Sequence, residues 1–141
     1  MRALLLPLLL ALPAFGGGPA APVPAPAPVA AARRVVSQTV GTDDLLLAIA
    51  APGQIAALSA LARDARYSPL AAEAAQQPCL RNGEAEDILR FRPDLVLVAS
   101  YTQAETVALL RRARVPVLQV DHFDSLEALY ANARRIGRAL V

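Results

Sequence analysis

Apolar, strand-like runs alternate with helical segments through residues 33–141, and this alternation constrains the fold more than any other feature. Strands that are apolar along nearly their whole length are typical of a sheet covered on both faces, which favours parallel pairing. The expected fold class is therefore α/β: a Rossmann-like lobe with a short, mostly parallel sheet flanked by helices. The predicted strands lie within 33–40, 54–61, 95–99 and 115–120.

Helix-end signals mark the segments between these strands. Thr42 is expected to N-cap one helix, with Asp43 at the positive end of its dipole. Thr102 and Glu105 fit a capping box for another. The predicted helical segments are 42–50, 70–75, 84–92, one that follows Thr102, and one that opens at Asp124. The last helix is expected to bury one apolar face made of Leu126, Leu129, Tyr130, Ala133, Ile136 and Leu140.

The first 32 residues differ in character from the rest. Residues 1–20 combine Arg2, an apolar stretch too short to span a bilayer, and small residues, which predicts a secretory signal peptide. The alternative is an uncleaved membrane anchor. Residues 21–32 alternate Ala and Pro and are expected to form an extended linker. These segments predict an exported protein.

Charge and motif content exclude several function classes. The formal net charge is +2, and all 14 basic residues are arginines without a basic stripe, so nucleic-acid binding is not expected. Cys79 is the one cysteine, which excludes an intrachain disulfide. No GxGxxG, P-loop or GxSxG motif occurs, so we expect no enzyme, no catalytic residue and no cofactor. Asp121 with His122 is not a metal-ligand set, and no metal site is predicted.

Polar residues gather where the predicted strands end. In open α/β sheets, ligands bind outside the carboxyl ends of the strands. The third strand is followed directly by Ser100, Tyr101 and Thr102. A helix-capping role explains Thr102 but leaves Ser100 and Tyr101 unexplained. Tyr101 and Tyr67 are the more informative residues, because a large amphipathic ring on a loop is suited to contact a ligand. Tyr101 is the strongest candidate, followed by Ser100.

Four segments in this order resemble the substrate-binding proteins of ABC importers for iron–siderophores, haem and vitamin B12. They are RRVVSQTVGTDDLLLAIA, QIAALSALARDARYS, NGEAEDILRFRPDLVLVASYT and VPVLQVDHFDSLEAL, and together they lie within 33–141. The most specific element is the short acidic helix that leads through RPDLVLV to a polar loop.

The resemblance implies an N-terminal lobe over residues 33–141 of a two-lobe protein that holds its ligand between the lobes and delivers it to a permease. It implies that Glu86 docks on permease arginines, and that the protein is a monomer. Helix-dipole stabilisation explains an acid at Glu86 equally well. The ligand contacts implied by the resemblance are Thr39, Gly41, Tyr67, Ser100, Tyr101 and Thr102.

Two questions stay open at this point. The chain stops at Val141, so the second lobe is expected to be absent and the chain to be truncated. The alternative function is a secreted single-lobe α/β interaction module without ligand transport. The ligand class is also open: a cleft lined by Arg and Tyr favours anionic siderophores, and a hydrophobic aromatic cleft favours a corrinoid or haem.

Overall fold

The structure is a computed structural model that describes residues 30–141. The predicted signal peptide and residues 21–29 of the predicted linker lie outside the described residues. The end of the linker contacts the folded part, because Ala32 is buried and its N–H donates to the carbonyl of Ala139 over 2.9 Å. Within 30–141, no helix is both long and apolar enough to cross a membrane.

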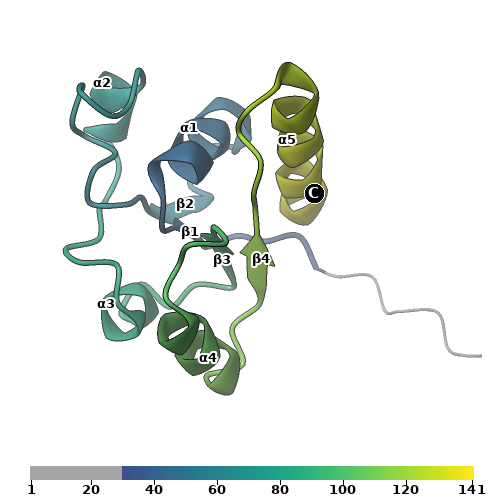
Figure 1. The fold of residues 1–141 in the computed structure, drawn as a ribbon. Coiled ribbons are helices and arrows are strands. Elements are labelled where there is room, and N and C mark those ends of the chain that lie inside the picture. Colours follow the sequence, from purple (N-terminus) through teal and green to yellow (C-terminus); the bar gives the residue numbers. More distant parts are fainter. Residues whose placement is uncertain (1–29) are drawn as a thin grey trace, which may run out of the picture.

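Four short parallel strands form the centre of the molecule (Figure 1). Their order across the sheet is β2-β1-β3-β4, and every neighbouring pair is parallel. The two inner strands are fully buried, which explains their unbroken apolar character. The predicted α/β fold with a parallel sheet is confirmed. The strands are β1 (Val35–Ser37), β2 (Ile55–Ala57), β3 (Leu95–Val98) and β4 (Val117–Gln119).

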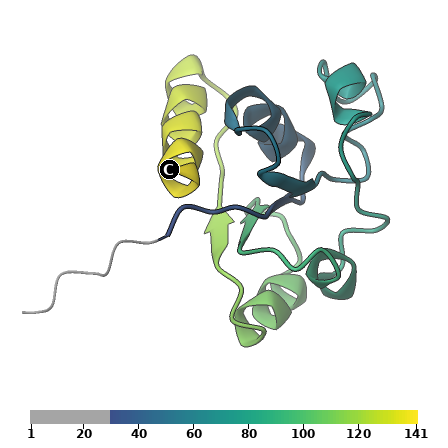
Figure 2. The ribbon, with the colours of Figure 1, turned by 180° about the vertical axis from the view of Figure 1, so that it is seen from behind.

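Helices cover both faces of this sheet (Figures 1 and 2). On one face α1 packs against α5, with Leu46 and Ile136 in the same apolar cluster as Leu97. On the other face α3 packs against α4, with Ile88 and Leu110 against Val96. The helices are α1 (Val40–Ile49), α2 (Ala71–Ala74), α3 (Ala85–Leu89), α4 (Ala104–Arg112) and α5 (Leu126–Leu140).

The predicted apolar face of α5 is only half correct. Ile136 and Leu140 are buried, but Leu126 is 68% exposed and Tyr130 is 63% exposed. Asn132 is buried in their place, and its amide donates to the backbone carbonyls of the loop that follows β4. The first turns of α5 lie beside this loop, so only the second half of the helix reaches the apolar core.

The predicted cap at Thr42 is wrong, because α1 begins at Val40 and its N-cap is Thr39, three residues before Thr42. Thr42 lies inside the helix and is fully buried. Its hydroxyl oxygen lies 2.7 Å from the Ser37 hydroxyl and donates to the Thr39 carbonyl over 2.9 Å. A hydroxyl near a helix start can either cap the helix or form a buried contact. Here the Thr42 hydroxyl contacts Ser37 at the end of β1.

Asp94, which precedes β3, joins that strand to the start of β1. Its carboxylate accepts the backbone N–H groups of Arg33 and Arg34 over 2.8 and 2.9 Å. The Arg34 side chain in turn donates to the carbonyls of Phe91 and Arg92, just before β3. These contacts align the amino ends of the two central strands.

Candidate ligand-binding site

A hollow of about 470 Å³ lies at the carboxyl ends of the strands, where the sequence placed a site. Its walls come from the start of α1, the loop after β2, the loop before α3, and the loop between β3 and α4. The lining residues are Gln38, Thr39, Val40, Ser59, Ala60, Leu61, Asn82, Gly83, Glu84, Tyr101, Thr102, Gln103 and Thr106. The hollow is therefore made by four segments that are far apart in the chain.

Gln38 connects three of these walls. Its side-chain carbonyl accepts a hydrogen bond from the Thr102 hydroxyl over 2.7 Å, and its amide donates to the Gly83 carbonyl over 3.3 Å. The Thr102 hydroxyl also accepts the N–H of Ala99 over 3.1 Å. One side chain after β1 thereby holds the loop after β3 and the loop before α3 in place.

The predicted capping box at Thr102 and Glu105 is wrong. Helix α4 begins at Ala104, its N-cap is Gln103, and no side chain caps it. The Thr102 hydroxyl is used instead by Ala99 and Gln38, which lie at the ends of two neighbouring strands. Thr102 is thus a wall residue whose hydroxyl fixes the shape of the hollow.

Replacing Thr102 by valine removes this hydroxyl and keeps the volume of the side chain. We expect the free energy of unfolding to fall by about 1–2 kcal/mol, because Gln38 and the N–H of Ala99 each lose a partner. Urea denaturation followed by circular dichroism measures the loss. Thr102→Ser keeps the hydroxyl and is the matched control. If the serine and valine variants are equally unstable, the hydroxyl contacts do not stabilise this site.

Beneath the hollow lies the buried carboxylate of Asp43. It accepts hydrogen bonds from the N–H of Ser59 over 3.0 Å and from the Ser59 hydroxyl over 2.5 Å. Burial raises the pKa of Asp43 to about 6, although the hydrogen bonds from Ser37 and Ser59 act in the opposite direction. Because Ser59 lines the hollow, this wall is held by a carboxyl group whose pKa lies above its ordinary value.

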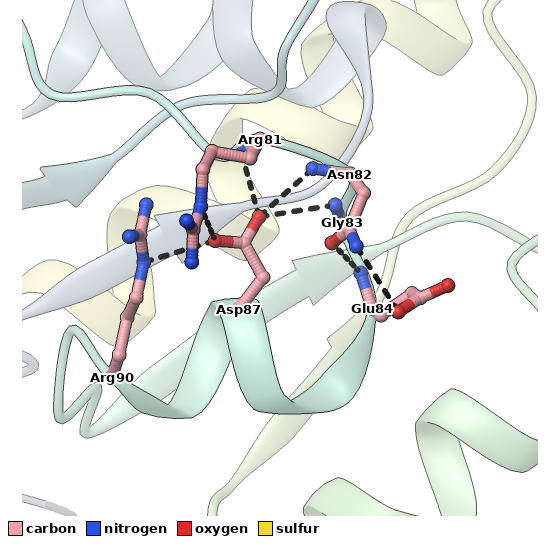
Figure 3. A network of polar contacts seen from close by, with 6 residues as sticks. All are labelled: Arg81, Asn82, Gly83, Glu84, Asp87 and Arg90. Atoms are coloured by element: carbon pink, nitrogen blue, oxygen red, sulfur yellow. Dashed lines mark hydrogen bonds and ion pairs between the residues drawn. The ribbon is translucent and has the colours of Figure 1, made fainter.

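A second buried carboxylate, Asp87, shapes the loop before α3 (Figure 3). One of its oxygens accepts three successive backbone N–H groups, from Arg81, Asn82 and Gly83, over 2.6, 3.0 and 3.3 Å. The Arg90 guanidinium pairs with the other oxygen at 2.9 Å. Burial acts to raise the pKa of Asp87, but the N–H groups and Arg90 outweigh it and hold this pKa below its ordinary value.

Three of the six predicted ligand residues line the hollow. Thr39 lies at the N-cap of α1, and Tyr101 and Thr102 lie on the loop after β3. The Tyr101 side chain is 74% exposed, so its ring is available to a ligand. The hydroxyl of Thr39 is buried and lies 2.9 Å from that of Thr42.

The other three predicted residues do not line the hollow. Gly41 lies beneath the ring of Phe123, close enough that an added Cβ atom would lie 3.0 Å from it. Tyr67 is more than half exposed, and the Arg66 guanidinium lies over its ring at 5.5 Å. The N–H of Ser100 donates to Asp121 over 2.6 Å, which fixes the loop after β3 to the end of β4.

Sequence reasoning missed several lining residues. Gln38 and Ser59 were recognisable as polar residues that follow strands, but their roles depend on partners 64 and 16 residues away. Asn82 and Glu84 lie on the irregular segment before α3, which brings them to the hollow through its contacts with Asp87. The local signal was an Asn-Gly pair directly before an acidic helix start.

Glu86 is exposed on the first turn of α3. It lines a smaller depression of about 220 Å³, beside the hollow, together with Glu84 and Glu105. Within the described part of the chain, no group of three or more His, Cys, Asp or Glu residues could hold a metal ion. His122 lies in the loop after β4 with φ of +60°, and its carbonyl accepts a hydrogen bond from the Asn132 amide.

Several solved periplasmic binding proteins share this fold over part of their length. The vitamin B12-binding protein of Vibrio cholerae is 19% identical to the chain, with a TM-score of 0.61 over 77% of the chain and 41% of that protein. A haem-binding protein from Pseudomonas aeruginosa is 21% identical, with a TM-score of 0.62 over 75% of the chain and 37% of its own. A possible iron-binding protein from Staphylococcus epidermidis is 18% identical, with a TM-score of 0.61 over 77% of the chain and 42% of that protein.

The chain spans about two fifths of the length of these solved structures. At these identities the likeness establishes the fold, and it agrees with the resemblance predicted from the sequence. No protein-family model matches the chain. No curated protein matches it in sequence.

Proposed function

We propose that the chain is the N-terminal lobe of a periplasmic substrate-binding component of an ABC importer. Its ligand is an iron complex, either a siderophore or haem, or cobalamin. One observation carries the proposal: the strand-end hollow lies on a fold shared with periplasmic proteins that bind vitamin B12, haem or iron. A binding role also accounts for the hydroxyl and amide side chains that converge on the hollow.

In this proposal the exposed Tyr101 ring contacts the ligand from one wall. Thr39, whose hydroxyl is paired with that of Thr42, forms part of another wall, and Thr102 shapes the loop that carries Tyr101. Ser100, Gly41 and Tyr67 remain proposed contacts, although they do not line the hollow. Export through the N-terminal segment brings the lobe to the periplasm, and Glu86 docks on arginines of the permease. The exposure of Glu86 beside two other glutamates supports the docking role, because a basic partner surface complements it.

Isothermal titration calorimetry with cyanocobalamin, haemin and ferric siderophores tests the ligand class. We expect at least one of them to bind. We also expect Tyr101→Ala to weaken that ligand about tenfold, because the ring supplies a large contact area at low conformational cost. Tyr130→Ala is the matched control: this tyrosine is similarly exposed but lies on α5, outside the hollow.

Two results contradict the proposal in different ways. If none of these compounds binds, the proposed ligand class is wrong. If a compound binds but Tyr101→Ala and Tyr130→Ala weaken its binding equally, the ligand does not bind in the hollow.

A further inference from the structure

The side chains that line the hollow are almost all uncharged. Eight of the 13 lining residues carry a side-chain amide or hydroxyl, and Glu84 is the one charged residue among those that the described part contributes. This lining matches neither an arginine-rich cleft for anionic siderophores nor an aromatic cleft for a flat macrocycle. Five of these eight side chains already form hydrogen bonds within the protein, whereas those of Tyr101 and Gln103 are exposed and available to a ligand. The lining residues of the described part include no cation that would balance an anionic ligand.

The Glu84 side chain is held in place. The Asn82 amide donates to its carboxylate over 3.0 Å, and the N–H of Glu84 donates back to the Asn82 side chain over 3.1 Å (Figure 3). Asn82 is itself fixed, because its N–H donates to Asp87. The negative charge at this wall therefore has a defined position.

Nearby arginines do not neutralise this charge. Arg81 and Arg90 direct their guanidinium groups at Asp87, at 3.7 and 2.9 Å (Figure 3). Within residues 30–141, Glu84 forms no ion pair. Glu86 and Glu105 line the adjoining depression and add charge of the same sign. An anionic ligand in the hollow would thus meet like charge, with no compensating cation among the lining residues of the described part.

We propose that the hollow selects an uncharged ligand rich in amide or hydroxyl groups, and that Glu84 determines this specificity by repelling anionic ligands. This inference rests on the proposed function, since it names the substrate class of the same site. The Tyr101 hydroxyl and the Gln103 amide, which form no hydrogen bond within residues 30–141, pair with polar groups of such a ligand, while Glu84 acts against carboxylate-bearing chelates. Glu84 is a specificity-determining residue in this assignment.

The experiment compares two uncharged probes, cyanocobalamin and ferrichrome, with two anionic probes, haemin and ferric citrate, by calorimetry at low ionic strength. We expect an uncharged probe to bind wild type most tightly. We expect Glu84→Gln, which keeps the shape of the side chain, to tighten an anionic probe about tenfold and to change the uncharged probe less than twofold. Glu127→Gln, an exposed glutamate on α5 outside the hollow, is the control and is expected to change neither.

Each remaining outcome decides a different point. An anionic probe that binds wild type most tightly overturns the inference and leaves the proposed function standing. The same holds if Glu84→Gln and Glu127→Gln change the anionic probes equally. If no probe binds wild type or either variant, the proposed function fails, and the inference that rests on it fails as well.

Discussion

Replacing Asp87 by alanine is expected to lower the free energy of unfolding by about 3 kcal/mol. The substitution leaves the N–H groups of Arg81, Asn82 and Gly83 without their shared acceptor, and it releases Arg90 from its ion pair. Each N–H that loses a buried partner costs roughly 1 kcal/mol or more. Urea denaturation followed by circular dichroism measures the change. Glu86→Ala is the matched control, because this neighbouring acid is exposed and its removal is expected to cost less than about 0.5 kcal/mol.

The effect of Asp87 also has a defined pH dependence. The pKa of Asp87 is lower in the folded chain than its ordinary value of 3.8, so the folded state favours the ionised form. The stabilisation is complete above an ordinary aspartate pKa of about 4, and it is lost as the pH falls through the folded-state pKa. Wild type and Asp87→Ala are therefore expected to converge in stability as the medium becomes more acidic. A difference between them that is unchanged at pH 3 would contradict the assigned role of the carboxylate.

Replacing Asp43 by asparagine is expected to remove a pH dependence of the opposite sign. The folded chain holds the Asp43 proton to about pH 6, whereas the unfolded chain loses it near 3.8. Between these values the folded state binds the extra proton, so rising pH lowers the stability. A difference of roughly 2 pKa units corresponds to about 3 kcal/mol between the two ends of the window. The asparagine oxygen still accepts the N–H of Ser59, and its amide can donate to the Ser59 hydroxyl.

Urea denaturation at several pH values from 4 to 7.5 tests this expectation. Above pH 6 the Asp43→Asn variant is expected to be at least as stable as wild type, and its stability is expected to change less across the window. Asp124→Asn is the control, since Asp124 is exposed, and it is expected to keep the wild-type profile. An asparagine variant that is clearly less stable than wild type at pH 7.5 would mean that the buried site requires the charge.

The fold and the position of the hollow were predicted from the sequence pattern. The strands at Val35–Ser37 and Leu95–Val98 are buried on both faces, so their apolar runs carried an unambiguous signal. The end of a parallel strand then located the hollow. Tyr101 was found because a large ring on a loop at that edge has few structural reasons to be there.

The roles of the hydroxyl and carboxyl groups could not be predicted in the same way. Thr102 followed by Glu105 fits a capping box, but the local pattern is the same when the hydroxyl bonds a distant glutamine. From the sequence, Asp43 near a helix start is expected to interact with the helix dipole. Its hydrogen bond with Ser59 becomes visible only in the structure. Contacts of this kind depend on how separate segments meet, and that information is absent from any short window of sequence.

The position of Gln38 has a consequence for how the hollow responds to a ligand. Because the Gln38 side-chain amide bonds both the Thr102 hydroxyl and the Gly83 carbonyl, a shift of one loop alone would break a hydrogen bond. Their order is established when the chain folds, so a ligand that enters finds these walls already assembled and loses little affinity to their ordering. Ligand binding is then expected to leave amide hydrogen exchange in these two loops nearly unchanged, in contrast to a site that closes around its ligand.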